Sequence, residues 1–373
     1  MSGVPATDTD IVIVGAGIAG ASLAAELAPH RSVILLEAED QPGLHATGRS
    51  AAFYAETYGG PGVQPLTTAS KALLFAPPDD FTDHPFVSDR GALHIADANS
   101  RAALAAFQAE FANSPVPLTP LVSGGARERV GIISEAWNGP AIYEPECRDI
   151  DVAALHAAYL GAARRAGAQI RTASALTCAR HDGGAWTVET ASGDLRASLL
   201  VNAAGAWSDP VAERCGVRAI GLQPLRRTMV AADIDAEVDP DWPLIVAADG
   251  SFYFKPDGGR LWISPHDEIP DEPGDARPEE LDIAVAIDRF EKATTARVTR
   301  VETSWAGLRT FAPDRLPIYG FDPDSPAFFW CAGQGGFGIQ TAPAAARLCR
   351  DLILERPAEA AIDAASYAPQ RLR

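Results

Sequence analysis

A glycine-rich turn between a strand and a helix, near the start of the chain, most restricts what this sequence can fold into. The apolar run DIVIVG (10–15) is typical of a buried strand, and GAGIAGASLAAELA (15–28) continues with apolar residues at helical spacing. Gly15, Gly17 and Gly20 form G-x-G-x-x-G at this junction. In that motif one glycine permits the bend, the next lets the backbone approach a diphosphate, and the third lets helix pack on strand. The pattern predicts a Rossmann-like unit in which the start of the helix, including Ile18 and Ala19, faces the diphosphate.

A second strand follows at the spacing that a dinucleotide site requires. SVILLEAE (32–39) places Glu37 about 20 residues beyond the central glycine, where a carboxylate can accept hydrogen bonds from the ribose of adenosine. The next stretch, QPGLHATGRSAAF (41–53), is a Gly- and Ser-rich loop that carries Arg49. A simple nicotinamide-binding domain would continue into another regular strand and helix, so this loop favours FAD over NAD.

Two later stretches also bring backbone close to a large, flat ligand. LLVNAAGAWSD (199–209) is an apolar strand that ends in small residues, and FFWCAGQGGFGIQTAPAAARL (328–348) is a strand, a glycine-rich turn and a helix. Ordinary helix capping is the alternative explanation for the second turn. Four glycines between 333 and 338 exceed what one helix cap needs, so we expect cofactor contact there.

Length, charge and cysteine content limit the class of protein. A chain of 373 residues suggests about two domains. The net charge of −18 disfavours binding to nucleic acid and to anionic membrane surfaces. The five cysteines show no C-x-x-C spacing, so neither a disulfide framework nor a metal site is expected, and a cytoplasmic location fits best. No apolar stretch is long enough for a transmembrane segment, and no signal peptide is expected.

Taken together, these stretches resemble the D-amino-acid oxidase superfamily of FAD enzymes, which includes glycine oxidase and monomeric sarcosine oxidase. Within it the likeness is greatest to D-arginine dehydrogenase and related D-amino-acid dehydrogenases. The resemblance extends over nearly the whole chain, through GAGIAGAS, QPGLHATGRSAA, VNAAGAW, GLQPLRR, SFYFKPD, SWAGLR and QGGFGIQT in that order.

The resemblance implies an α/β (α+β) fold with a Rossmann-like FAD-binding domain and a second, mainly antiparallel-sheet domain that binds substrate, as in D-amino-acid oxidase and glycine oxidase. The FAD-binding domain is expected to be discontinuous, with segments 1–85, 146–218 and 312–373. Residues 86–145 and 219–311 would form the substrate-binding domain. Beyond the glycine motif and Glu37, the expected cofactor contacts are His45, Thr47, Gly48, Arg49, Ser50, Ala51, Ala204, Gly205, Gly335, Gly336, Gly338, Ile339 and Gln340.

Periodicity and turn residues agree with that layout. Residues 151–166 have a helical period with Asp151 placed to cap the helix, and 278–293 reads as an exposed amphipathic helix. Strands are expected at 226–234, 251–256 and 260–264, and a hairpin within 185–202. The acidic, Pro-rich stretch 267–280 is expected to be a solvated loop.

The pair Arg226 and Arg227 stands between apolar neighbours, as does Arg309 in SWAGLRTFAPD (304–314). A buried substrate carboxylate needs charge-assisted donors in fork geometry, which arginine supplies. Adjacent residues on a strand face opposite sides, so only one of the pair can point at the flavin. The resemblance assigns Arg227 and Arg309 to the carboxylate and leaves Arg226 as a surface or FAD-domain contact. Solvated strand residues and a structural salt bridge remain the alternatives.

The resemblance also implies that Tyr253 lies over the substrate and that Tyr58 and Gln340 line the same cavity. Two positions depart from the D-arginine dehydrogenase pattern. Ala92 stands where that family has a glutamate, and Phe53 where it has a histidine, which makes the side-chain pocket less polar. Asp89 could replace the missing glutamate. Some relatives attach FAD through a cysteine on the stretch 301–320, which has none here, so a noncovalent flavin is expected.

The function expected from these features is FAD-dependent oxidative deamination of a D-amino acid, with uncharged, apolar or aromatic side chains favoured, to an imino acid, then to a 2-oxo acid and ammonia. No pair of histidines or carboxylates is marked as a general base, so hydride transfer from a neutral amine is the expected chemistry, with His45 and His266 structural. The electron acceptor, a quinone, another acceptor or O₂, stays open. The alternatives are a glycine- or sarcosine-type amine oxidase, a 2-hydroxy-acid oxidoreductase, and a flavin-binding protein without turnover.

Overall fold

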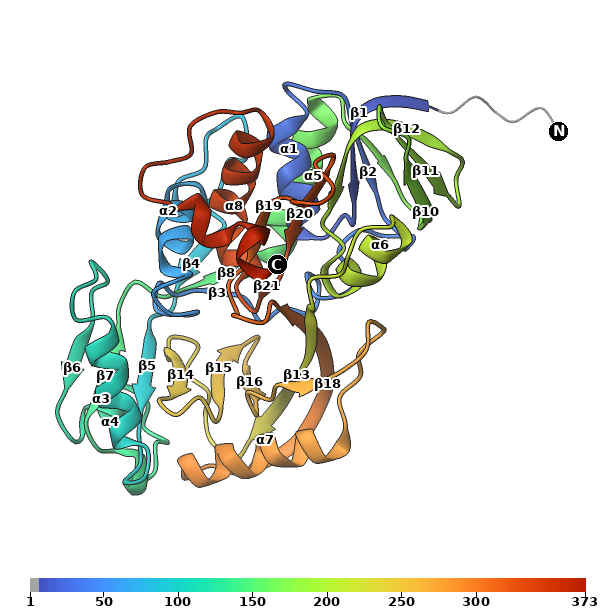
Figure 1. Ribbon diagram of the computed structural model, residues 1–373. Coiled ribbons are helices and arrows are strands. Elements are labelled where there is room, and N and C mark those ends of the chain that lie inside the picture. The colour runs from blue at the N-terminus through green and yellow to red at the C-terminus, as the bar shows by residue number, and fades with distance from the viewer. Residues whose placement is uncertain (1–6) are drawn as a thin grey trace.

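A parallel sheet assembled from distant parts of the chain forms one half of the protein, in a computed structural model that describes residues 7–373 (Figure 1). Its parallel strands, in spatial order, are β9 (Gln169–Arg171), β2 (Val33–Leu36), β1 (Thr7–Val14), β12 (Leu195–Asn202) and β20 (Phe328–Ala332). Antiparallel strands extend it: β10 (Leu176–His181) and β11 (Trp186–Thr190) beside β12, and β19 (Ile318–Phe321) beside β20. The predicted Rossmann-like sheet and the hairpin within 185–202 are confirmed.

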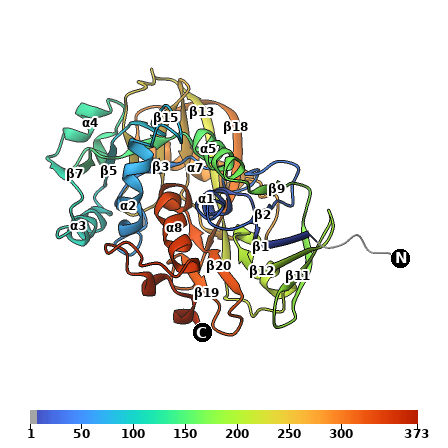
Figure 2. The same ribbon diagram turned by 90° about the horizontal axis from the view of Figure 1, so that it is seen from above.

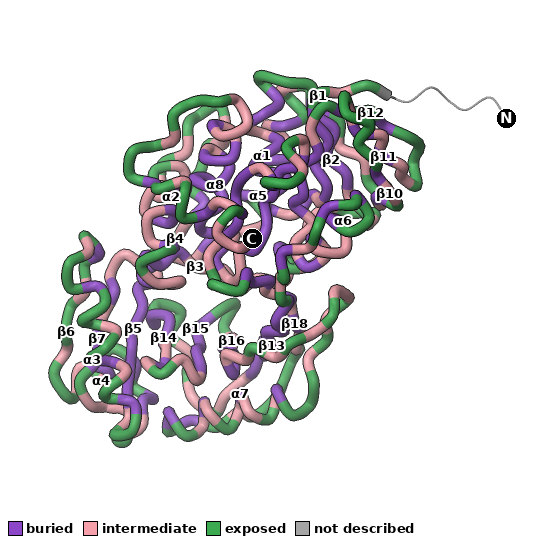
Figure 3. The backbone as a smooth tube through the Cα atoms, viewed as in Figure 1, coloured by how far each residue is buried: buried purple, intermediate pink, exposed green. Residues whose placement is uncertain are grey.

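Helices cover this sheet and bury its apolar residues. Figure 2 shows α1 grouped with α8 and α5. The helices of this half are α1 (Ile18–Leu27), α2 (Gln64–Phe75), α5 (Val152–Arg165), α6 (Ser208–Arg214) and α8 (Gly338–Ile353). Helix α5 begins where predicted, because the side chain of Asp151 accepts a hydrogen bond from the backbone N of Ala154 at 2.8 Å. Figure 3 shows the buried backbone concentrated in these central strands and helices.

A second, ten-stranded sheet forms the other half. Only one pairing along its path, β14 with β5, is parallel, so the predicted mainly antiparallel sheet is confirmed. Its strands, in spatial order, are β21 (Gln334–Gly335), β18 (Val298–Phe311), β13 (Gln223–Ile234), β16 (Arg260–Ser264), β15 (Tyr253–Asp257), β14 (Leu244–Ala247), β5 (Ala92–Ile95), β7 (Ala141–Glu144) and β6 (Thr119–Leu121), with β17 (Ile269–Pro270) paired to β13.

The two faces of this second sheet have different roles because side chains alternate along each strand. On one face, Val230 and Ala232 of β13 pack against Phe290 of helix α7 (Glu280–Ala293). On the other face, Met229 of β13 packs against Tyr253 of β15. Figure 1 places α7 on the outer side of the sheet, so the second face is turned toward the first half of the molecule.

A small three-stranded sheet lies between the halves, with β8 (Arg148–Ile150) paired to both β3 (Phe53–Tyr54) and β4 (Val87–Asp89). The remaining α-helices are α3 (Arg101–Glu110) and α4 (Gly125–Arg129), and single 3-10 turns are η1 (Glu135–Trp137), η2 (Gly205–Trp207), η3 (Ala364–Tyr367) and η4 (Pro369–Leu372). Within residues 7–373, every helix is too short or too polar to cross a membrane.

Candidate active site

One long cavity between the two halves brings most of the predicted site residues together. Its wall includes the following residues predicted to contact the cofactor: Gly15, Gly17, Ile18, Ala19, Glu37, His45, Thr47, Arg49, Ser50, Ala51, Ala204, Gly205, Gly335, Gly336, Gly338, Ile339 and Gln340. The predicted substrate contacts on the same wall are Phe53, Tyr58, Arg227, Tyr253 and Arg309. Gly20, Gly48 and Ala92 are the predicted site residues that do not line it.

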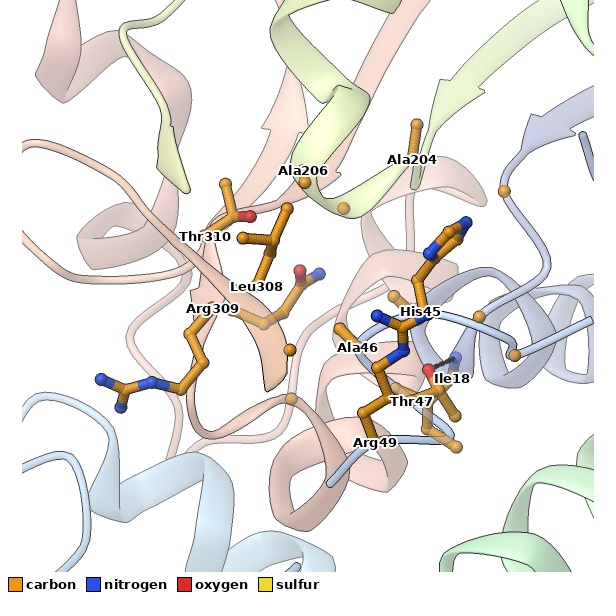
Figure 4. A pocket seen from close by; sticks show the side chains of 18 of the residues that line it. Ile18, His45, Ala46, Thr47, Arg49, Ala204, Ala206, Leu308, Arg309 and Thr310 are labelled. Atoms are coloured by element: carbon orange, nitrogen blue, oxygen red, sulfur yellow. Dashed lines mark hydrogen bonds between the residues drawn. The ribbon is translucent and has the colours of Figure 1, made fainter. Parts of the chain in front are cut away.

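The turn between β1 and α1 is closely packed. Gly15 has φ +99°, and a Cβ atom there would come within 2.5 Å of the carbonyl oxygen of Ala203. A Cβ atom on Gly20 would overlap the carbonyl oxygen of Gly15, so Gly20 packs helix on strand and lies outside the cavity. Thr47, from the loop 43–50, accepts a hydrogen bond from the backbone N of Ile18 at 3.0 Å, as Figure 4 shows. Thr47 therefore caps α1 from a distant part of the chain.

Glu37 and His156 hold the middle of this turn from two sides. The carboxylate of Glu37 accepts hydrogen bonds from the backbone N of Ala16 and of Glu39, both at 3.1 Å. His156 of α5 donates from Nε2 to the carbonyl oxygen of Ala16 at 2.8 Å, and burial lowers its pKa. Sequence reasoning missed His156. Its only signal was a histidine among the mainly apolar residues 152–163 of the helix.

The loop 43–50 carries His45 and Arg49 to the cavity, where Figure 4 shows them on the side opposite the Arg309 side chain. His45 contacts Glu39 through Nε2 at 2.9 Å, while its buried Nδ1 has no partner among residues 7–373. Gly48 serves the loop itself, since a Cβ atom there would come within 2.6 Å of the carbonyl oxygen of Gly43. The prediction that Gly48 lines the cofactor site is wrong for this reason.

Arg49 ties the loop 43–50 to the second sheet. Its guanidinium pairs with Asp275 at 2.5 Å and donates to the carbonyl oxygens of Ala276 and Ala306 at 2.8 and 3.2 Å. Asp275 is a member of the acidic stretch that was expected to be a solvated loop. The stretch is largely irregular and exposed, as predicted, with the Asp275 side chain 59% exposed, but the prediction did not include its contact with Arg49 at the site.

Arg227 and Arg309 lie on the same face of neighbouring strands. In the register of β13 and β18, Leu225 is opposite Arg309 and Arg227 is opposite Gly307, which makes the two arginines diagonal neighbours. Arg227 is 6% exposed. In Figure 4, Arg309 extends from β18 to the side opposite Leu308 and Thr310. Two buried donors, Nη2 of Arg227 and Nε of Arg309, have no hydrogen-bond partner among the described residues.

Arg226 points to the opposite face, as strand alternation predicted, but its expected role as a surface or FAD-domain contact is wrong. It is 7% exposed and lies under α7. Its guanidinium pairs with Glu279 at 2.7 Å, Asp282 at 3.1 Å and Asp271 at 3.5 Å. These carboxylates satisfy the buried charge within the second half of the molecule.

Aromatic side chains surround the end of the cavity next to the arginines. The ring of Phe53 lies 5.1 Å from that of Tyr58 and 6.3 Å from that of Tyr253. Burial opposes ionisation of Tyr58, but the charges of Arg309 and Arg227 outweigh it and lower its pKa. The hydroxyl of Tyr58 accepts a hydrogen bond from Nη1 of Arg309 at 3.2 Å, whereas the hydroxyl of Tyr253 donates to Sδ of Met229 at 3.1 Å.

Gln340 fixes the backbone that carries Tyr58. Its Oε1 accepts from the N of Ala55 at 3.0 Å, and its Nε2 donates to the carbonyl oxygen of Tyr58 at 3.1 Å and to Thr67 at 3.0 Å. A Cβ atom on Gly336 would come within 2.5 Å of the Tyr58 hydroxyl. The glycine therefore leaves the space in which Tyr58 meets Arg309.

Neither Ala92 nor Asp89 shapes the cavity directly. Ala92 is 1% exposed and packs in an apolar cluster with Met229 and Tyr253, behind the cavity wall. The predicted role of Ala92 as a wall residue is wrong. The side chain of Asp89 is 97% exposed and pairs with Arg148 at 2.9 Å, so Asp89 does not stand in for a pocket glutamate.

The segment 266–268 supports the arginines from one side. Burial, followed by the charge of Arg227, lowers the pKa of His266 to about 3, so its ring is neutral and bonds through Nδ1 to the carbonyl oxygen of Gly250 at 2.5 Å. Asp267 accepts from the Nε of Arg227 through its carbonyl oxygen at 2.9 Å. Glu268 accepts from Nη2 of Arg309 at 2.6 Å. Composition gave no sign of the roles of Asp267 and Glu268.

A family model described as FAD dependent oxidoreductase (DAO) matches residues 10–352. The chain belongs to this family. Glycine oxidase of Geobacillus kaustophilus (strain HTA426) is 25% identical over 375 residues, which cover 97% of each protein. The crystal structure of glycine oxidase from Geobacillus kaustophilus has a TM-score of 0.85, covering 98% of this chain and 99% of that chain at 25% identity. L-Proline dehydrogenase from P. horikoshii shares the fold, with a TM-score of 0.83 at 19% identity over 98% of both chains.

Family membership identifies FAD as the cofactor, and the residues of the cavity fit it. The wall extends from the carboxylate of Glu37, beside the glycine turn, to Arg309 in the second sheet. The partnerless Nδ1 of His45 supplies a polar atom along this path. The superfamily predicted from sequence is thus confirmed. The narrower likeness to D-arginine dehydrogenase is corrected, since a glycine oxidase matches over 97% of the chain.

Proposed function

We propose that this FAD-dependent oxidoreductase oxidises a small amino acid of the glycine or N-methylglycine type at the carbon next to nitrogen. The observation that carries the proposal is the arginine pair in the cavity, with two buried donors that have no hydrogen-bond partner within residues 7–373. A buried guanidinium with an unused donor needs an acceptor, and a substrate carboxylate supplies it in fork geometry. The glycine oxidase relatives support an amine as the oxidised group.

The side chains of this protein would position the substrate rather than exchange protons with it. Arg227 and Arg309 hold the carboxylate, and Tyr58 orients Arg309 through the 3.2 Å hydrogen bond. Bound FAD supplies the acceptor for the hydride that leaves the α-carbon. The substrate amine contributes its lone pair to the new C=N bond and must be neutral to do so. Its proton goes to water, and hydrolysis of the imine then yields a 2-oxo acid and an amine or ammonia.

The aromatic lining favours a small substrate side chain. Phe53, Tyr58 and Tyr253 stand close together beside the arginines, and Met229 fills the space next to the Tyr253 hydroxyl. Burying a charged side chain here would leave that charge without a partner, which costs more than the burial of its methylenes gains. A neutral D-amino acid with a short apolar side chain is the second candidate, because the same arginines would hold its carboxylate.

Anaerobic mixing of the yellow holoprotein with single substrates tests this function. We expect glycine, sarcosine or a short neutral D-amino acid to bleach the flavin absorbance, with D-arginine and D-lysine much slower. Bleaching by 2-hydroxy acids but by no amine would overturn the proposal, as would a flavin that no substrate reduces. Reoxidation of the reduced protein by air or by a quinone then identifies the acceptor class.

A further inference from the structure

We propose that the carboxylate of Glu268 occupies the position that a second substrate carboxylate would need. Glu268 thereby restricts the site to amines with one carboxylate. This inference rests on the proposed function, because it assumes that Arg227 and Arg309 receive the first carboxylate. Glu268 would then be a specificity-determining residue that substrate does not have to touch.

Three guanidinium groups converge on one oxygen of Glu268. Its Oε1 lies 2.6 Å from Nη2 of Arg309, 2.8 Å from Nη2 of Arg315 and 3.8 Å from Nη2 of Arg227. Such convergence is how a protein binds an external carboxylate. Here the carboxylate belongs to the chain itself, and it occupies donors of Arg309, which lines the cavity, and of Arg315, which lies next to it.

Arg315 is held in place for this contact. Its guanidinium lies 4.0 Å from the ring centroid of Phe311, and its backbone has φ +67°, which is uncommon outside glycine. Arg315, whose side chain is 52% exposed, therefore contacts Glu268 from the solvent side. Burial opposes ionisation of Glu268, but the hydrogen bonds and charges of Arg315 and Arg309 outweigh it and lower its pKa, so the carboxylate is charged at neutral pH.

The charged side chains around the arginines carry a net charge that one substrate carboxylate would neutralise. Arg227, Arg309 and Arg315 carry three positive charges. Glu268 contributes one negative charge, and Asp267, whose Oδ1 lies 3.6 Å from Nε of Arg227, contributes another. A substrate with one carboxylate neutralises the remaining charge. A substrate with two would leave an uncompensated negative charge beside Arg227 and Arg309, whose side chains are only 7% and 12% exposed, which is unfavourable.

Titration of the holoprotein with butyrate and with succinate tests the inference, with binding followed by the change in the flavin spectrum. These unreactive acids have similar length and differ in the second carboxylate. In Glu268→Gln, we expect the ratio of succinate to butyrate affinity to rise at least about 10-fold, the effect of one charge-assisted contact. Glu268→Asp, which keeps the charge, should retain most of the wild-type ratio. Retained FAD and an unchanged melting temperature confirm folding.

Glu279→Gln is the matched control. Glu279 belongs to the same acidic segment and also pairs with an arginine, Arg226, but on the opposite face of β13. Its substitution removes the same charge and should leave the ratio of succinate to butyrate affinity unchanged.

An unchanged ratio in Glu268→Gln overturns the inference. An equal gain in affinity for both acids also overturns it, because it would mean that Glu268 competes with the first carboxylate. Binding of neither acid by the wild type also overturns it. Failure of the proposed function would appear separately, as a flavin that binds acids but is reduced by no amine.

Discussion

Arg226 donates a hydrogen bond to Asp282 at 3.1 Å beneath helix α7, on the face of β13 opposite to Arg227. Two adjacent arginines thus belong to different parts of the molecule. Arg226 joins β13 to α7 through carboxylates, whereas Arg227 lines the cavity, and its Nη2 has no hydrogen-bond partner in the part of the chain that the structure describes. Arg226 thus contributes to the packing of α7, and we propose the substrate carboxylate as the partner of Arg227.

Arg226→Met is expected to destabilise the fold without impairing the site. Removing one partner of a buried ion pair leaves Asp282 uncompensated, which costs about 3 kcal/mol of unfolding free energy. Urea unfolding measures this loss. Flavin reduction per bound FAD should stay near the wild-type value. A variant as stable as the wild type would show that these ion pairs contribute little.

The flavin is expected to be released when the holoprotein is precipitated with acid. No cysteine lies among the described residues that line the cavity, so no thiol stands ready for a covalent bond. The absorbance of supernatant and pellet after precipitation measures the partition. Yellow colour that stays in the washed pellet would contradict the prediction.

Acidification is expected to weaken the fold through His266. Burial, followed by the charge of Arg227, lowers its pKa from 6.5 to about 3 in the folded protein. The unfolded chain binds a proton to this ring below pH 6.5 and the folded chain does not, so the contribution of His266 is complete above pH 6.5 and is lost as pH falls toward 3.

The loss from this one group amounts to about 1.4 kcal/mol per pH unit within that range. His266→Asn provides the comparison, because asparagine also tolerates the φ of +53° at this position. The free energy of unfolding of the wild type should fall more steeply with acid than that of the variant. Parallel curves for the two proteins would contradict the assignment.

The local features of this site could be predicted from the sequence, whereas the contacts between residues far apart in the chain could not. The strand, the glycine turn and the opposite orientations of Arg226 and Arg227 follow from periodicity and from alternation along a strand, which are properties of neighbouring residues. The roles of Asp267 and Glu268 do not, because Glu268 meets Arg309 across 41 positions, and the pairings of β17 with β13 and of β13 with β18 bring them together. Composition suggested a solvated loop there, since acidic residues are usually exposed.

Ala92 and Gly48 show a second limit of prediction from sequence, because neither residue lines the cavity. Gly48 lies in the loop 43–50, whose other residues line the cavity, whereas no described residue of β5 lines it. Ala92 sits on β5, where it packs behind the cavity with Met229. Gly48 is required by the turn of its own loop, next to the carbonyl of Gly43. The position of a residue in a motif predicts which segment lies near the site. Whether its side chain faces the site depends on the tertiary packing around it.

Phe53→Ala is expected to widen the accepted range of substrates. The ring of Phe53 packs against Tyr58 and Tyr253, so its removal opens space beside the arginines. The ratio of kcat/KM for D-leucine to that for glycine should rise by about 10-fold or more, as two to three newly buried methylenes contribute about 0.8 kcal/mol each. Phe107→Ala, which removes a ring that stacks on His94 in the second half, is the control. An equal change of the ratio in both variants would rule out a specific effect of Phe53.

Anaerobic flavin reduction by glycine and by glycinamide, in the wild type and in Arg309→Met and Arg227→Met, tests the central claim most directly. The amide keeps the reacting carbon and nitrogen but has no carboxylate. If the arginines hold that carboxylate, the wild type reduces its flavin at least about 10²-fold more efficiently with glycine than with the amide, and each variant loses most of this preference while still binding FAD. If glycine is not reduced measurably, the same comparison is made with sarcosine and D-alanine against their amides. Equal efficiency of acid and amide in the wild type, or full retention of the preference in both variants, would contradict the account.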